Sequence, residues 1–246
     1  MGIYIPNRQQ SLRLLAIAGL VATLTACGSD SDDLPTPPVP PAPPPPPPVD
    51  VSYDVTVTNL TNAQPLSPVA VVLHDEGNLW TIGESASVAL EQMAEGGDTA
   101  ELRALSVVLA EASGAAPIGP GGSETISITI QDNEMANISI TTMLVNTNDA
   151  FTGLNAWSLA DLAVGDSWTT VTRAYDAGTE ANSEAAGTMP GPADGGEGFN
   201  AVRDDADFVA LHPGVVTGDD GLGSSVLTVL HKIDNPVVRI TITRTE

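Results

Sequence analysis

Apolar and polar residues alternate in several short runs of the chain, and this pattern constrains the fold more than any other feature. Side chains of a strand point alternately to opposite faces, so each run predicts a strand with one apolar face. Such strands bury their apolar faces against a second sheet, which predicts a mostly antiparallel β-sandwich. The alternating or β-branched runs are residues 51–58, 68–73, 125–130, 137–141, 168–172 and 237–243.

A short helical insertion is expected between the second and third of these strands. Residues 85–95 carry apolar residues near helical spacing and stop at a Gly-Gly pair. Residues 98–113 begin with DTAE, which is similar to a capping box, and predict a second helix. A hairpin-like turn is expected at residues 131–134, between two of the alternating runs. The expected fold class is therefore all-β, with two helices inserted.

The first 27 residues have the features of an export signal. Two arginines are the only charges before Cys27, and an apolar run follows them at residues 14–22, too short to predict a spanning helix. The sequence LTAC at residues 24–27 resembles the bacterial lipobox, and Cys27 is the sole cysteine. This resemblance implies a diacylglycerol thioether on Cys27, cleavage before it, and membrane anchoring by several acyl chains. A simple secretory peptide with an incidental cysteine is the alternative.

The lipoprotein resemblance also implies a location. Gly28 stands where an aspartate would favour retention in the inner membrane, so an outer-membrane lipoprotein is expected, with its face, periplasmic or surface, left open. Residues 28–50 predict a disordered, acidic and proline-rich stalk. Six consecutive prolines at residues 43–48 exclude helix and sheet and favour extended polyproline II, which gives a reach of roughly 50 Å. The alternative for this stalk is a proline-rich ligand for a partner domain. Residues 51–246, which follow it, are expected to form one domain.

Charge narrows the classes of function. The chain has 8 Lys and Arg against 31 Asp and Glu, a formal net charge of −23. This excess argues against nucleic acid and against anionic lipid as partners, and it attracts divalent cations. Nucleophile-elbow, zinc-protease, phosphate-loop and dinucleotide motifs are absent from the sequence. Zinc is disfavoured because cysteine and clustered histidine are lacking.

Carboxylates gather in two turns that follow β-prone runs. Asp176 and Glu180 are four residues apart, and Gly178 between them permits a tight bend that points both at one spot. Asp149, at the end of another strand, could join them. Ca²⁺ takes several oxygen ligands in flexible geometry. The spacing predicts one Ca²⁺ site formed by Asp149, Asp176 and Glu180 at one end of the sandwich; ordinary polar turns are the alternative.

Other polar segments leave alternatives open. The acidic runs Asp204-Asp205-Ala206-Asp207 and Asp219-Asp220 are either a second ion site or solvated loops. Residues 187–198, rich in Gly, Pro, Ala and acids, predict an exposed loop. His74 precedes two acids and follows a strand, which indicates a turn histidine or a functional one.

Nearly all of residues 51–246 resembles the spondin domain, known from F-spondin and mindin and from bacterial lipoproteins. The resemblance is carried by YDVTVTNLT at 53–61, PLSP at 65–68, His74, NDAFTGL at 148–154, DAGTE at 176–180 and PVVRITI at 236–242. It implies a C2-like antiparallel β-sandwich. It also implies that Asp149, Asp176 and Glu180 correspond to the family's calcium-binding acids. Glu180 replaces an aspartate of the animal members, and the disulfide cysteines of those members are missing.

Three functions follow as hypotheses. The first is a non-catalytic, calcium-binding adhesion or interaction module, anchored through Cys27 and presenting loops to an extracellular protein or glycan. The second is a structural envelope lipoprotein without a dedicated ligand. The third is a hydrolase that uses a pair of acids.

Overall fold

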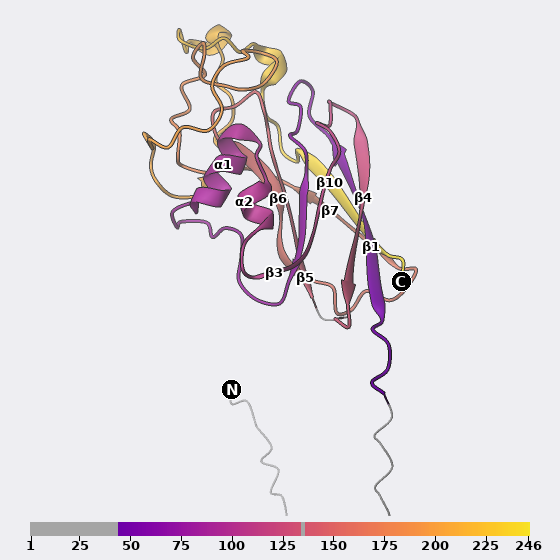
Figure 1. Ribbon diagram of the computed structural model, residues 1–246. Coiled ribbons are helices and arrows are strands. Elements are labelled where there is room, and N and C mark those ends of the chain that lie inside the picture. The colour runs from indigo at the N-terminus through magenta and orange to yellow at the C-terminus, as the bar shows by residue number, and fades with distance from the viewer. Residues whose placement is uncertain (1–43, 134–135) are drawn as a thin grey trace, which may run out of the picture. The chain divides into compact units, whose positions relative to one another are not determined.

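The computed structural model describes residues 44–133 and 136–246, of which Pro46–Glu246 form one compact unit. The predicted signal peptide, the lipobox with Cys27 and most of the stalk lie outside the described residues. Within the described ranges, ten strands form two antiparallel sheets, as the sequence predicts for an all-β sandwich (Figure 1). No helix in these ranges is long and apolar enough to cross a membrane.

One sheet has four strands with one face in the core and one in solvent. Their order is β4-β1-β10-β7. Along β1, every second residue is buried, which confirms the strand predicted from the alternation. On the outer face, hydroxyl pairs such as Thr56 with Thr125 and Thr169 with Thr241 join neighbouring strands. The bounds are β1 (Asp50–Asn59), β4 (Ser123–Gln131), β7 (Ser167–Thr172) and β10 (Val238–Arg244).

The second sheet has six strands in the order β3-β2-β5-β6-β8-β9. Its inner face packs on the first sheet. The bounds are β2 (Ala70–His74), β3 (Val108–Ser113), β5 (Asn137–Met143), β6 (Ala150–Ser158), β8 (Ala174–Asp176) and β9 (Ala210–Leu211). The largest fully buried side chains between the sheets are Tyr53, Leu66, Leu73, Ile138, Ile140, Leu144 and Leu159.

Two helices cover the outer face of the six-stranded sheet, so this face is buried as well: α1 (Val88–Gly96) packs on β5 and β6, and α2 (Ala100–Arg103) packs on β2 and β3 (Figure 1). The Ser87 hydroxyl accepts a hydrogen bond from the Leu90 amide and begins α1, and Gly97 ends it in the left-handed region at φ 70°. This second core is centred on Leu90, Met93, Leu102, Met143 and Phe151.

Two sequence-based expectations are wrong. The second predicted helix, residues 98–113, ends at Arg103, and residues 108–113 form β3, which pairs with β2. Thr99 makes no capping hydrogen bond through its side chain. The hairpin expected at residues 131–134 does not exist either, since β4 pairs with β1 and β5 pairs with β2 and β6. The chain instead crosses there from one sheet to the other, so both apolar faces enter the same core.

Long loops follow β8 and gather at one end of the sandwich (Figure 1). They contain two short 3₁₀ helices, Gly218–Asp220 and Val229–His231. Residues 187–198, expected to be an exposed loop, are partly buried, because Met189 packs with Val215 and Leu227 in a small separate core.

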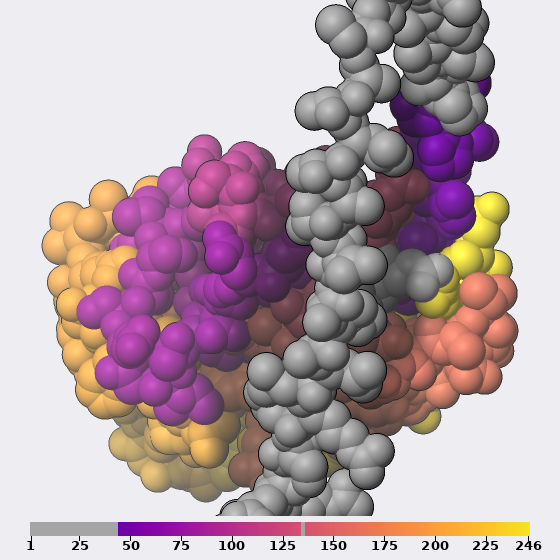
Figure 2. Space-filling model, turned by 90° about the horizontal axis from the view of Figure 1, so that it is seen from below, coloured from indigo at the N-terminus to yellow at the C-terminus, as the bar shows by residue number. Residues whose placement is uncertain are grey.

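At the opposite end, the turn that joins β6 to β7 lies against the C-terminal residues (Figure 2). The Gly165 amide donates to the Arg244 carbonyl at 2.8 Å, and the Arg244 amide donates to the Asp166 carbonyl at 3.1 Å.

Candidate metal centre

Strand pairing brings the first two predicted acids together. Asp149 immediately precedes β6, and Asp176 is the last residue of β8. The two strands are antiparallel and Ala150 pairs with Asp176, so the start of one lies beside the end of the other. Both aspartates are buried at this junction. Carboxylate oxygens of Asp149 and Asp176 therefore lie close to each other, as a shared site would require.

The third carboxylate of the cluster belongs to Asp205. One oxygen of each of Asp149, Asp176 and Asp205 lies within 4.8 Å of the others. Asp205 is exposed, so the cluster opens to solvent on its side. The acidic run at residues 204–207 was the only sequence signal for this residue, and it was interpreted as either a second ion site or a solvated loop, not as part of this site.

Gly178 explains how the segment of Asp205 reaches the cluster. The Gly178 carbonyl accepts a hydrogen bond from the Asp207 amide at 2.7 Å. Gly178 has φ +69°, and a Cβ at this position would lie 2.3 Å from the Phe208 carbonyl oxygen. Only glycine allows both the backbone conformation and this close approach.

Glu180, the third ligand expected from the sequence, lies outside the cluster. Its carboxylate accepts a hydrogen bond from the Asn148 side-chain amide at 3.0 Å. Burial raises the pKa of Glu180 to about 7, and the charge of Glu95 on α1 adds to this rise. Glu180 does serve the cluster through its backbone, because its amide donates to Asp149 at 3.1 Å.

Asp149 is the most unusual group of the site. Its Oδ2 accepts hydrogen bonds from the Thr179 amide at 2.8 Å and from the Glu180 amide at 3.1 Å. Its Oδ1 is buried and has no hydrogen-bond partner among the described residues. Burial, reinforced by the charge of Asp176, raises the pKa of Asp149 to about 7. An ionised Asp149 thus lacks a compensating positive charge at Oδ1.

A chain of hydrogen bonds fixes Asp176. The Gly178 amide donates to Oδ1 at 2.8 Å, and the Asn182 side-chain amide donates to Oδ2 at 2.6 Å. The oxygen of Asn182 lies 3.0 Å from Nε2 of His212, whose Nδ1 accepts from the Gly214 amide at 2.9 Å. His212 therefore carries its proton on Nε2, and burial lowers its pKa, which keeps the ring neutral. Such outer partners hold a ligand in one orientation.

The remaining predicted polar residues lie elsewhere. His74 is buried at the end of β2, with Nε2 2.8 Å from the Ser139 hydroxyl and Nδ1 2.9 Å from the Glu76 carbonyl oxygen, so both nitrogens serve the fold. Asp219 and Asp220 are exposed, and Asp220 pairs with Lys232. These two acids form a solvated loop rather than part of the cluster.

Comparison with protein-family models gives no match, and comparison with curated proteins gives no significant match either. The donor atoms of the cluster themselves indicate which ligand it suits. They are carboxylate oxygens, two of them on buried residues, and the one nearby histidine is turned to Asn182 and Gly214. Such a set suits a hard cation that prefers oxygen.

Proposed function

We propose that this protein is a non-catalytic, calcium-binding interaction module, held at the bacterial envelope by a lipid on Cys27. One observation carries the metal part of the proposal. Asp149 Oδ1 is buried and has no hydrogen-bond partner within the described residues, and a carboxylate oxygen of Asp149 lies within 4.8 Å of oxygens of two further acids. Three acids that converge in this way repel one another unless a cation neutralises them. A bound cation would supply the missing partner of Oδ1.

Ca²⁺ fits this donor set better than other common ions. Zinc favours nitrogen and sulfur ligands, and no such atom points into the cluster within the described residues. Mg²⁺ demands near-ideal octahedral geometry, whereas Ca²⁺ accepts six to eight oxygens in flexible arrangements and keeps water among them. The exposed side of Asp205 leaves room for such waters.

The position of the cluster suggests what the ion does. Its three acids come from the start of β6, the end of β8 and the loop that contains residues 204–207. An ion bound by all three would tie that loop to the sheet and order this end of the sandwich. Ordered loops on a lipid-anchored domain suit contact with an extracellular protein or glycan, and the spondin resemblance supports the same role.

Thermal unfolding of the purified protein in EDTA and in millimolar Ca²⁺ tests the metal site. A free Ca²⁺ concentration of 100 times Kd would stabilise the folded state by about 2.7 kcal/mol, which is roughly 5–10 °C for a domain of this size. Asp176→Asn should abolish this shift, and the exposed control Asp219→Asn should keep it. An unchanged melting temperature in the wild type, or an equal shift in Asp176→Asn, would contradict the proposal.

A further inference from the structure

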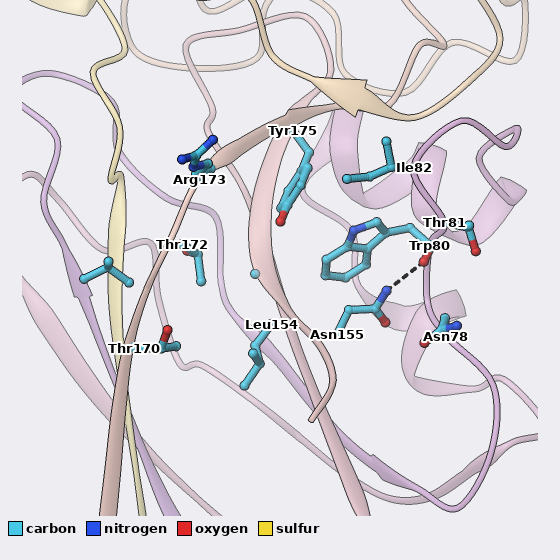
Figure 3. A pocket seen from close by; sticks show the side chains of 12 residues that line it. Asn78, Trp80, Thr81, Ile82, Leu154, Asn155, Thr170, Thr172, Arg173 and Tyr175 are labelled. Carbon is cyan, nitrogen blue, oxygen red and sulfur yellow. Dashed lines mark hydrogen bonds between the residues drawn. The ribbon is translucent and has the colours of Figure 1, made fainter. Parts of the chain in front are cut away.

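A cavity of 680 Å³ opens on the side of the sandwich, and none of the three acids of the cluster lines it. Three strips of consecutive residues line it: residues 80–82 in the loop after β2, residues 153–155 of β6, and residues 170–173 at the end of β7. Figure 3 shows Trp80 and Tyr175 on one side of this groove and Thr170 and Thr172 on the other.

The groove lies along the edge of β7 and not on one of its faces. Because side chains alternate between the faces of a strand, a cavity lined by residues 170–173 in succession meets the edge of the strand. β7 is the last strand of its sheet, and no described strand pairs with its free side. Backbone groups on this side of β7 can therefore pair with a further strand, except at its end, where the Arg173 carbonyl already accepts a hydrogen bond from the Thr152 hydroxyl at 2.8 Å.

Proteins usually protect such edges with charges or proline, and β7 has neither. Residues 167–172 contain three threonines and one valine, all favourable in a strand, and Val171 is 52% exposed. An unprotected edge of high β-propensity is what a partner strand needs in order to add to a sheet.

The opposite wall of the groove is rigid. The side-chain amide of Asn155 donates to the Trp80 carbonyl at 2.7 Å, and its oxygen accepts from the Leu79 amide at 2.9 Å. The Trp80 ring packs against Tyr175, with centroids 5.7 Å apart, and against Phe151, with centroids 5.2 Å apart. This wall is therefore apolar and is formed before a ligand binds, and the cavity beside it has the volume of a typical ligand site.

β6 and β7 are tied together on both sides of the groove. The hydroxyls of Thr152 and Thr172 lie 2.7 Å apart. Further along the same two strands, Trp157 and Trp168 stack with ring centroids 4.0 Å apart. These contacts fix the spacing of the strands, so the groove exists before a partner binds.

The charge of the groove is opposite to that of the chain. The protein has 31 Asp and Glu, yet none of those in the described part of the chain lines this cavity, whereas Arg173 does. Arg103, Arg203 and Lys232 each pair with a carboxylate. The Arg173 side chain forms no ion pair and no hydrogen bond within the described residues, so its guanidinium is available to an acidic partner.

We propose that this groove binds an extended polypeptide segment, which adds as a strand to the free edge of β7 and places an acidic side chain against Arg173. The strand edge explains the backbone recognition, Arg173 selects the acid, and the wall of Trp80 and Tyr175 takes an apolar side chain. An acidic sugar shares the need for Arg173 but makes no use of a strand edge, so the two partners can be separated by experiment.

The probe is an acetylated and amidated hexapeptide of alternating valine and threonine with glutamate at both ends, and its counterpart has glutamine at both ends. Isothermal titration of the purified protein, in EDTA and in Ca²⁺, should detect the glutamate peptide in at least one buffer. Arg173→Gln should weaken it about tenfold and change the glutamine peptide by less than about twofold. The control Arg239→Gln removes an exposed arginine outside the groove and should change neither peptide.

Backbone methylation of the probe tests the strand addition. A strand exposes its amides alternately to its two sides, so N-methylation of one alternate set should abolish binding, and methylation of the other set should preserve it. Three results would overturn the proposal: no binding of the glutamate peptide at millimolar concentration, equal effects of the two methylated sets, or equal effects of Arg173→Gln and Arg239→Gln. Arg173-dependent binding of an oligogalacturonate without binding of the peptide would assign the groove to an acidic sugar instead. Because either buffer suffices, failure of the calcium site leaves this test intact.

Discussion

Replacement of Asp149 by asparagine should shift stability in opposite directions with and without Ca²⁺. Oδ2 of Asp149 accepts the amides of Thr179 and Glu180, and the oxygen of an asparagine can accept the same bonds. The new amide group then takes the position of the buried Oδ1, beside an acidic cluster, and carries no charge there. In EDTA the change removes a buried, uncompensated charge. In Ca²⁺ it removes a ligand.

The size of the first effect follows from the pKa of Asp149. Burial and the charge of Asp176 raise this pKa from 3.8 to about 7. An ionised Asp149 above neutral pH therefore costs the folded state about 4 kcal/mol. Because Asp176 and Asp205 still repel each other in the variant, we expect Asp149→Asn to stabilise the metal-free protein by about 2–4 kcal/mol, or roughly 4–16 °C. Saturating Ca²⁺ should then stabilise the wild type, which keeps all three carboxylates, and should not stabilise the variant.

Urea unfolding at mildly alkaline pH, in EDTA and in Ca²⁺, measures both effects. Glu184→Gln is the matched control, since Glu184 is another buried acid. Its oxygens accept hydrogen bonds from the Val216 amide at 2.6 Å and the Thr217 amide at 3.0 Å, so an amide there loses an acceptor. Glu184→Gln should destabilise equally in both buffers. If Asp149→Asn destabilises as much in EDTA as in Ca²⁺, the carboxylate of Asp149 is not an uncompensated charge and the reasoning fails.

Three further predictions concern pH, the glycine turn and the helical core. Because Asp149 and Glu180 have raised pKa values, these two groups bind more protons in the metal-free folded state than in the unfolded state, and their contribution to the free energy of unfolding should fall as pH rises from about 4 to about 7. Burial lowers the pKa of His212, which opposes this trend. Ca²⁺ should reduce the fall in urea titrations. Gly178→Ala should cost more than about 2 kcal/mol of stability and weaken the Ca²⁺ response. Gly165 also has a positive φ, but a Cβ there would meet no atom within 4 Å, so Gly165→Ala should cost only about 1 kcal/mol; calorimetry measures both. Leu90→Ala, fully buried on α1, should cost about 2–5 kcal/mol by urea unfolding at any Ca²⁺ concentration.

The strands with one solvent face could be predicted closely from the sequence. Burial on one face imposes a period of two, and β1, β4, β7 and β10 show it. The six-stranded sheet is buried on both faces where α1 and α2 cover it, so its alternation fades. β6 was not predicted for this reason: its first four residues are all buried, and Gly153 and Asn155 weaken its β-propensity.

Pairing between distant strands could not be predicted from local pattern. Leu105, Val108 and Leu109 fit a helix by spacing, yet residues 108–113 pair with β2, which would otherwise present an open edge. This tertiary contact outweighs helix propensity, whose differences amount to less than about 1 kcal/mol per residue. Residues 131–134 had the composition of a hairpin turn, but the core between the sheets decides that β4 and β5 face each other instead of pairing.

The candidate site also has residues that the sequence predicted and one that it did not. Acidic turns after apolar runs were enough to group Asp149 with Asp176, although Asp149 precedes β6, a strand that the sequence did not predict. Asp205 joins them only through long-range backbone bonds to the turn of Gly178. The short strand β8 also connects the two proposed sites, because Tyr175 lines the groove and its neighbour Asp176 belongs to the acidic cluster. β8 has only three residues, which pair with β6 on one side and with the two-residue strand β9 on the other. An ion held by Asp176 would stabilise the strand that presents Tyr175, and since coupling between sites is reciprocal, a peptide favoured by Ca²⁺ must raise the affinity for Ca²⁺ by the same factor.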